Sequence, residues 1–114
     1  EKTMSVKIPE SVISCPNFIG GEWVRGDAGT FDVISPYNGK KIGEATIPSA
    51  AQIKKAIEAA EAAQKAWGAT PMKERAQVLF NFRNILMRDI DEMSHLKASE
   101  SGKNFAEGKA GLMK

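Results

Sequence analysis

The chain has 114 residues, of which 42% are hydrophobic and 26% charged, and its 16 Lys and Arg against 14 Asp and Glu leave a net charge of +2. This length suits one small domain that buries roughly 60–70% of the surface exposed by its unfolded chain. The apolar fraction is too high for intrinsic disorder, and no run of about 18 apolar residues could form a transmembrane helix. Because the net charge is near zero, we expect neither a nucleic acid nor a membrane as a partner.

Residues 1–16 are expected to form a loose N-terminal arm, because they lack sustained periodicity and contain Pro9 and Pro16. They also lack the continuous apolar stretch of a secretory signal, and no transit peptide is seen. Cys15 is the only cysteine, which excludes an intrachain disulfide and fits a reducing compartment. We therefore expect a cytoplasmic protein, or one of the mitochondrial matrix if the source is eukaryotic.

Residues 17–48 have the composition of short β-strands separated by turns. Aromatic and β-branched residues favour a strand in three segments, namely residues 18–24, 30–34 and 40–47. The connection at 25–29 holds two glycines, and the connection at 35–39 ends in Asn-Gly, a pair that readily adopts positive φ. Such short connections predict a small antiparallel β-meander.

After Pro48 the apolar period changes from two residues to 3.6, and residues 49–114 are expected to be helical. Ser49 and Gln52 stand at the spacing of a capping box, in which each side chain bonds the other residue's backbone amide. Apolar residues then recur on one helix face as far as Trp67. Gly68 is expected to end this first helix as a left-handed cap.

The next helix is expected to use Thr70 as its N-cap and Pro71 as its first helical residue. Its apolar stripe runs to about residue 93, with a bend near Asp89, where an acidic segment resembles a new helix start. Gly102 is the predicted stop. The sequence therefore predicts two helices, or three if the bend separates the second into two.

A final helix is expected to begin at a capping box formed by Asn104 and Glu107, and its pattern still holds at Lys114. We therefore expect the chain to be cut inside this helix and to belong to a longer protein. The apolar helix faces exceed what three short strands can cover, so exposed apolar patches are also expected.

The residues provide no self-sufficient catalytic set. Cys15 is the only thiol and His95 the only imidazole, and nothing in the sequence indicates that they meet as nucleophilic catalysis requires. We therefore expect Cys15 to be an incidental thiol. No second His or Cys stands near His95 at ligand spacing, so a surface or helix-end position is expected for it rather than a metal site.

The pair Gly102-Lys103 does not form a phosphate-binding loop. That pattern needs Gly where Lys97 stands and Ser or Thr where Asn104 stands, so a helix stop followed by a helix start explains the same residues. No Gly-x-Gly-x-x-Gly is present for a dinucleotide either. We assign no catalytic, cofactor-binding or metal-binding residue to this chain.

Several motifs follow one another in an order that can be compared with known families. Asn-Phe-Ile-Gly-Gly-Glu-Trp-Val at 17–24 resembles the opening strand of the aldehyde dehydrogenase superfamily, and Asp-Val-Ile-Ser-Pro-Tyr-Asn-Gly-Lys at 32–40 resembles its following turn, usually Asn-Pro-Ala-Thr-Gly-Glu. Further segments follow in the family's order and spacing, at residues 42–44, 47–48, 59–67, 75–79 and 100–103. The resemblance covers nearly the whole chain from residue 17 onward.

Within the superfamily, Ala-Thr-Pro-Met-Lys-Glu-Arg-Ala-Gln-Val-Leu-Phe-Asn-Phe-Arg at 69–83 is similar to the helix entry of methylmalonate-semialdehyde dehydrogenases. This resemblance implies an α/β parent enzyme that oxidises a semialdehyde with NAD, releases carbon dioxide and forms an acyl-coenzyme A. The implied partners are a small-molecule aldehyde, coenzyme A and further copies in a homo-oligomer. Ser-Pro-Tyr at 35–37 and Asn-Phe at 104–105 depart from the commoner Asn-Pro-Ala and Thr-Leu.

The resemblance places the family's nucleophilic Cys, general-base Glu, oxyanion Asn and NAD-contacting residues beyond residue 114. The chain alone is therefore expected to be inactive scaffold, with an arm at 1–16, a β-meander at 17–48 and, at 49–114, the truncated helical N-terminal part of the coenzyme-binding domain. Two alternatives stay open: a non-acylating semialdehyde dehydrogenase, and a noncatalytic helical module whose apolar stripes bind a partner helix. The strand signals before Pro48 weigh against the second.

Overall fold

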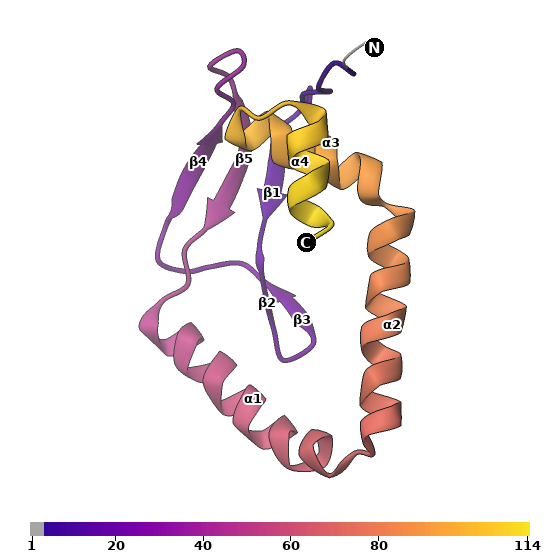
Figure 1. Cartoon of the computed structure of the whole chain (residues 1–114). Coiled ribbons are helices and arrows are strands. Elements are labelled where there is room, and N and C mark those ends of the chain that lie inside the picture. The colour runs from indigo at the N-terminus through magenta and orange to yellow at the C-terminus, as the bar shows by residue number, and fades with distance from the viewer. Residues whose placement is uncertain (1–3) are drawn as a thin grey trace. The chain divides into compact units, whose positions relative to one another are not determined.

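The computed structural model describes residues 4–114, in which five strands are followed by four helices (Figure 1). The strands are β1 (Ile13–Cys15), β2 (Asn17–Ile19), β3 (Glu22–Val24), β4 (Thr30–Ile34) and β5 (Lys41–Thr46). The helices are α1 (Ala50–Ala69), α2 (Met72–Arg88), α3 (Ile90–Ser101) and α4 (Phe105–Leu112). A small set of strands followed by helices confirms the predicted fold class.

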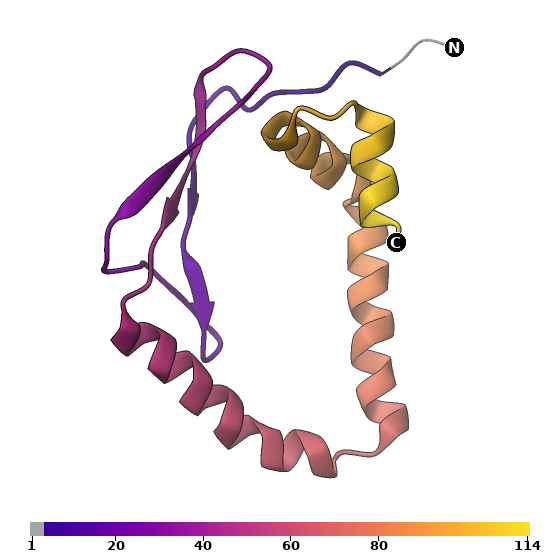
Figure 2. The ribbon, with the colours of Figure 1, turned by 60° about the vertical axis from the view of Figure 1, so that its left-hand side comes forward.

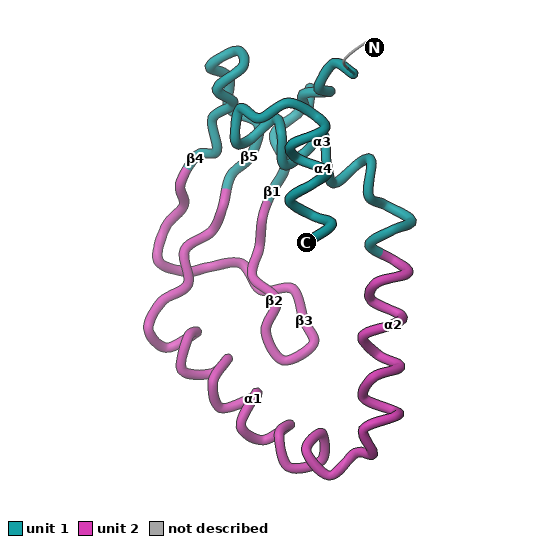
Figure 3. Tube along the Cα trace, viewed as in Figure 1, with its two compact units in different colours: residues 1–14, 32–44, 86–114 teal, residues 15–31, 45–85 magenta. Residues whose placement is uncertain are grey.

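The chain forms two compact units (Figure 3). Unit 1 contains the described residues up to Ser14 together with residues 32–44 and 86–114. Unit 2 contains residues 15–31 and 45–85. Each unit therefore combines strand segments with helical segments.

The strands form two sheets, so the prediction of a single three-stranded meander is wrong in its pairing. β2 and β3 pair antiparallel with each other, with Asn17 opposite Val24. Gly20 and Gly21 connect them at φ of 60° and 83°, where a side chain would be strained. The single strand expected over residues 18–24 is therefore a two-stranded hairpin, because a Gly-Gly pair readily forms a two-residue turn.

The other sheet has the strand order β1-β5-β4. A turn joins β4 to β5 and is closed by the Ser35 N–H on the Lys40 carbonyl at 2.9 Å and the Gly39 N–H on the Ser35 carbonyl at 2.8 Å. Neighbouring strands joined by so short a connection run antiparallel. β1 belongs to the segment expected to be a loose arm, so that prediction is wrong for Ile13–Cys15.

The start of α1 is held by a polar network that the capping-box prediction described only in part. The Ser49 hydroxyl accepts from the Gln52 N–H at 3.2 Å, as predicted. The Gln52 amide group instead donates to the Arg25 carbonyl at 3.0 Å and accepts from the Asp27 N–H at 3.3 Å. Asp27 in turn accepts from the Ser49 N–H at 3.0 Å. Asp27, in the turn before β4, thus accepts the hydrogen bond from the Ser49 N–H that Gln52 would accept in a complete capping box.

The predicted stop of α1 at Gly68 is wrong, because the helix continues to Ala69 and ends on Thr70. Thr70 has φ −66° and ψ 135°, and its hydroxyl donates to the Ala66 carbonyl at 2.9 Å. A proline disfavours helical conformation in the residue before it, so Pro71 places the end at Thr70. Thr70 therefore closes α1 rather than capping α2.

The predicted bend lies between α2 and α3, at Asp89. The Asp89 carboxylate does not cap α3 but accepts two hydrogen bonds from the Arg88 guanidinium, both at 2.9 Å. This pairing lowers the pKa of Asp89 and raises that of Arg88.

α4 folds back against α3, as Figures 1 and 2 both show. Gly102 ends α3 at φ 76°, as predicted. The predicted capping box is complete, because Asn104 accepts from the Glu107 N–H at 2.9 Å and Glu107 accepts from the Asn104 N–H at 3.1 Å. At Gly108, a Cβ atom would lie 3.0 Å from the Ser94 carbonyl oxygen, so the missing side chain permits close contact between the helices.

The buried hydrophobic residues among those described all lie in unit 1 and are Ile42, Ile90, Ala98 and Phe105. α1 and α2 have no buried residue, and apolar side chains such as Ile57, Leu79 and Phe82 are more than 60% exposed. The apolar stripes are thus present at helical spacing and are left uncovered, which confirms the expected exposed patches.

Gly26 provides a sharp test of the packing in unit 2. Its N–H donates to the Thr46 hydroxyl at 2.8 Å, and a Cβ atom there would lie 2.4 Å from the Ile47 carbonyl oxygen. We expect Gly26→Ala to lower the free energy of unfolding by about 1–3 kcal/mol, because backbone atoms cannot yield as a flexible side chain can. Urea unfolding followed by circular dichroism measures the change.

Gly68→Ala is the matched control, with the opposite expected sign. Gly68 lies inside α1, and an added Cβ would meet only the flexible end of Gln64, at 3.3 Å. Alanine inside a helix is more stable than glycine by about 1 kcal/mol. Equal effects of the two substitutions would contradict the assigned packing of Gly26.

Candidate functional site

The two residues considered for nucleophilic chemistry have different surroundings. Cys15 lies in β1 and is exposed. His95 lies in α3 with 9% of its surface exposed, so the expectation of a surface or helix-end position is wrong. Its ring packs against Phe105, with 4.6 Å between the ring centroids. That burial results from α4 folding onto α3, which the pattern of one helix does not reveal.

The His95 imidazole is engaged with the main chain. Its Nδ1 accepts the Lys7 N–H at 3.1 Å. Within residues 4–114, no three His, Cys, Asp or Glu side chains are grouped so that they could hold a metal ion. None of the helices in that part of the chain combines the length and apolar character needed to cross a membrane.

The Gly102-Lys103 pair is a helix junction, as the sequence indicates. Gly102 closes α3, and a Cβ atom on it would lie 3.0 Å from Cγ of Pro36. The Lys103 carbonyl accepts a hydrogen bond from the Tyr37 hydroxyl. The junction therefore attaches the turn between β4 and β5 to the end of α3.

A buried serine strengthens the same attachment. Ser35 has no exposed surface, and its hydroxyl donates to the Ser99 carbonyl at 2.9 Å. These turn residues belong to the segment 35–37, Ser-Pro-Tyr, which differs from the Asn-Pro-Ala expected from the resemblance described above. Two of these three residues, Ser35 and Tyr37, supply hydrogen bonds from the turn to α3 and the residues after it. The sequence shows that these residues differ from the expected motif, but it does not show that Ser35 contacts Ser99 or that Tyr37 contacts Lys103.

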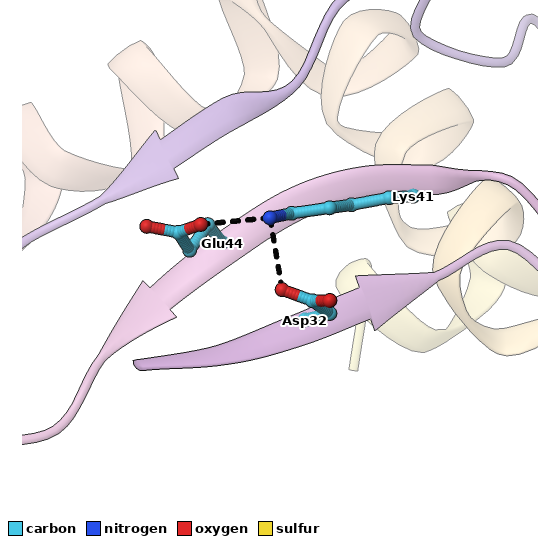
Figure 4. Close-up of polar contacts among 3 residues, drawn as sticks. All are labelled: Asp32, Lys41 and Glu44. Atoms are coloured by element: carbon cyan, nitrogen blue, oxygen red, sulfur yellow. Dashed lines mark hydrogen bonds and ion pairs between the residues drawn. The ribbon is translucent and has the colours of Figure 1, made fainter. Parts of the chain in front are cut away.

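Lys41 on β5 is shared between two carboxylates (Figure 4). Its ammonium lies 2.9 Å from Asp32 on β4 and 2.7 Å from Glu44 on its own strand. Hydrogen bonding to Glu44, and then to Asp32, raises the pKa of Lys41 above its ordinary value of 10.5. A lysine held protonated in this way is a poor nucleophile or base, so the cluster stabilises the sheet rather than performing chemistry.

An apolar groove runs between the β2–β3 hairpin and α1 in unit 2. It consists of two adjoining hollows of about 420 and 510 Å³, both lined by Phe18, Ile19, Ala56 and Ala60. The Phe18 ring packs on Trp23 at 4.9 Å between centroids. None of the groove's lining residues is titratable, so it suits an apolar partner surface and not acid–base chemistry.

The helix N-termini of the described residues do not fit a dinucleotide. A pyrophosphate binds there through free backbone amides. In α1 the Gln52 N–H is already bonded by Ser49, and in α4 the Glu107 N–H is bonded by Asn104. The first turn of α3 carries Asp91 and Glu92, and the first turn of α2 carries Glu74. Their negative charges repel an anion.

Comparison with known proteins identifies the family. Residues 23–114 match the aldehyde dehydrogenase family. The chain therefore belongs to that family, which confirms the resemblance seen in the sequence.

Similar curated proteins include semialdehyde dehydrogenases. A malonate-semialdehyde dehydrogenase of Halalkalibacterium halodurans is 35% identical over 80% of this chain and 19% of its own length. The NADP-dependent succinate-semialdehyde dehydrogenase GabD of Escherichia coli is 40% identical over the same shares. The chain thus spans about one fifth of the length of these relatives.

Solved structures of the family share the fold. A protein of Sinorhizobium meliloti assigned as a methylmalonate-semialdehyde dehydrogenase, crystallised with NAD, superposes with a TM-score of 0.82 at 29% identity. The match covers 89% of this chain and 21% of that one. The succinate-semialdehyde dehydrogenase of Burkholderia pseudomallei gives a TM-score of 0.82 at 34% identity, over 87% and 21% of the two chains.

The Lys41 cluster predicts a dependence of stability on alkaline pH. Because folding raises the pKa of Lys41, its contribution is complete below 10.5 and is lost as the pH rises through the folded-state value. We expect the wild type to resist urea more than Lys41→Met at pH 8, and the difference to shrink between pH 10.5 and higher values.

Lys54→Met is the matched control for this measurement. Lys54 pairs with Glu58 along α1 at 3.9 Å, and its side chain is 77% exposed. Such pairs contribute little, so this substitution should leave the urea midpoint nearly unchanged at every pH. A difference for Lys41→Met that persists undiminished at the highest pH would show that its charge does not act through the cluster.

Proposed function

We propose that the chain is the N-terminal scaffold part of an NAD-dependent semialdehyde dehydrogenase that passes its acyl group to coenzyme A. The observation that carries the proposal is the match of residues 23–114 to the family, with malonate- and succinate-semialdehyde dehydrogenases among the relatives. The NAD bound in the Sinorhizobium meliloti structure supports NAD as the coenzyme, and the NADP-dependent GabD of Escherichia coli makes NADP the alternative. In this proposal residues 49–114 begin the coenzyme-binding domain.

The chain's own contribution is mechanical. The bonds from Ser35 and Tyr37 attach the β4–β5 turn to the α3–α4 junction, and Lys41 joins two strands of the sheet. The capped or acidic helix N-termini support the part of the proposal in which other residues of the parent protein make the coenzyme contacts. No reaction step is therefore assigned to residues 4–114.

The uncovered apolar faces support a further part of the proposal. Ile57, Leu79 and Phe80 are more than 60% exposed, which suits burial in a longer chain and in a homo-oligomer. The exposed thiol of Cys15 fits a reducing, cytoplasmic setting. The same apolar faces favour the alternative of a noncatalytic interaction module, and the two experiments below separate these possibilities.

The isolated 114-residue chain should form no NADH or NADPH above background from malonate, methylmalonate or succinate semialdehyde. The physical reason is that the proposal assigns the nucleophile, the general base and the coenzyme contacts to residues of the parent protein other than 1–114. Absorbance at the reduced-nicotinamide band measures the rate. Cys15→Ala is the control, and a rate that it abolishes would show that Cys15 is a catalytic nucleophile.

The full-length protein tests the acyl acceptor. With NAD and malonate or methylmalonate semialdehyde, we expect faster NADH formation when coenzyme A is added, since a thiolate attacks a thioester readily where activated water is excluded. The products should be an acyl-coenzyme A and carbon dioxide, identified by mass. Turnover indifferent to coenzyme A that yields a free acid would favour a non-acylating enzyme, and no turnover of any semialdehyde would favour the noncatalytic module.

A further inference from the structure

A segment near the N-terminus, residues 4–9, lies against α3 within unit 1, and we refer to it as the strap. The Lys7 N–H of the strap donates to His95 Nδ1 at 3.1 Å. Beside this bond is a cleft of about 540 Å³, lined by strap residues that include Met4 and Ile8 and by α3 residues that include His95 and Leu96. The hydrogen bond therefore ties the strap backbone to one wall of the cleft.

This hydrogen bond requires a neutral imidazole. Nδ1 accepts a hydrogen bond only when it carries no proton, so the ring proton must be on Nε2. Protonation of His95 places an N–H at Nδ1, directly opposite the Lys7 N–H. Two donors would then face each other at the observed 3.1 Å, and the bond would be lost.

The ring has little freedom to avoid that conflict. His95 is 9% exposed and packs against Phe105 of α4, with 4.6 Å between centroids. Phe105 is itself 9% exposed, and the complete capping box at Asn104 orders the start of its helix. Rotation of the imidazole away from Lys7 would disturb this contact, so movement of the strap is the easier response.

Charged groups from each neighbouring element act on the ring. Asp91 and Glu92 of α3 line the cleft beside it. Lys7 of the strap and Lys109 of α4 bring positive charges. Lys109 is held by Asp91 at 3.2 Å and lies 5.9 Å from the centre of the Phe105 ring.

We propose that His95 is a pH-sensitive latch for the strap, which is docked while the imidazole is neutral and released when it is protonated. Histidine as a residue type changes charge between about pH 5 and 8, which sets the pH range in which the latch is tested. Release opens the cleft between the strap and α3. The inference does not depend on the proposed enzymatic function.

Nuclear magnetic resonance of the 114-residue chain tests the latch directly. As the pH falls from 8 to 5, we expect the hydrogen-exchange protection factor of the Lys7 amide to fall by about tenfold or more. This factor is corrected for intrinsic exchange rates, and the expected fall corresponds to the loss of one hydrogen bond. The midpoint should coincide with the titration of the His95 ring followed in the same samples. The Gly108 amide, which donates to the Asn104 carbonyl at 3.0 Å inside α4, is the internal control and should stay protected.

Two substitutions at His95 separate the latch from simple packing. His95→Asn offers an oxygen near the place of Nδ1 that does not titrate, and it should keep the Lys7 amide protected at both ends of the pH range. His95→Phe keeps an aromatic ring on Phe105 without an acceptor, and it should leave Lys7 unprotected at every pH. If His95→Phe does not fold, the wild-type titration and His95→Asn still decide the question. Unchanged Lys7 protection through the His95 titration, or the same acid loss in His95→Asn, would overturn the proposal.

Discussion

The reversal of the chain between α3 and α4 is the constraint on which unit 1 depends. Gly102 turns the backbone at φ 76°, the Asn104–Glu107 box starts α4 at once, and Gly108 lets α4 approach the Ser94 carbonyl. Gly102 adopts the left-handed conformation without strain, and the capping box satisfies backbone amides at the start of α4. Gly108 avoids the clash that a Cβ atom would cause. The reversal buries Phe105 and His95 and leaves backbone carbonyls of α3 and Lys103 available to the β4–β5 turn.

Hydrogen bonds join separate elements within both units. In unit 1 the fully buried Ser35 hydroxyl finds the Ser99 carbonyl, which avoids the cost of an unsatisfied buried donor. In unit 2 Asp27 and Gln52 join the 25–29 turn to the first turn of α1. The apolar side chains of α1 and α2 remain exposed, so these helices present surface to be covered.

Membership of the aldehyde dehydrogenase family can be related to the hydrogen-bonded turns and to the exposed apolar faces of α1 and α2. The chain spans about one fifth of its relatives' length, at 19% for two semialdehyde dehydrogenases. Cys15 is exposed on β1, His95 is buried on α3, and the helix starts carry side-chain caps or acidic first turns. Hydrogen-bonded turns and exposed apolar faces suit the proposed scaffold role, and the His95–Lys7 contact adds a hydrogen bond to a histidine.

The sequence by itself determined the features that depend on local chemistry. Strands before Pro48, helices after it, the Gly102 stop and the Asn104–Glu107 box were all predictable, because backbone preference and side chains three residues apart decide them. The family was recognisable from motif order for the same reason. The end of α1 lies at Ala69 rather than at the expected Gly68, because Pro71 restricts Thr70 to an extended conformation and glycine alone does not end a helix.

Only the tertiary structure decided which residues distant in the sequence meet. The partners of His95, Ser35 and Lys41 lie on other elements, so no spacing in the sequence reveals them. The pairing of β1 with β5 depended in the same way on contacts between remote segments. The spacing of apolar residues along the sequence shows which residues share a helix face. Whether that face is buried depends on which other element packs against it. Thus the polar His95 became buried under α4, while the apolar Leu79 stayed exposed.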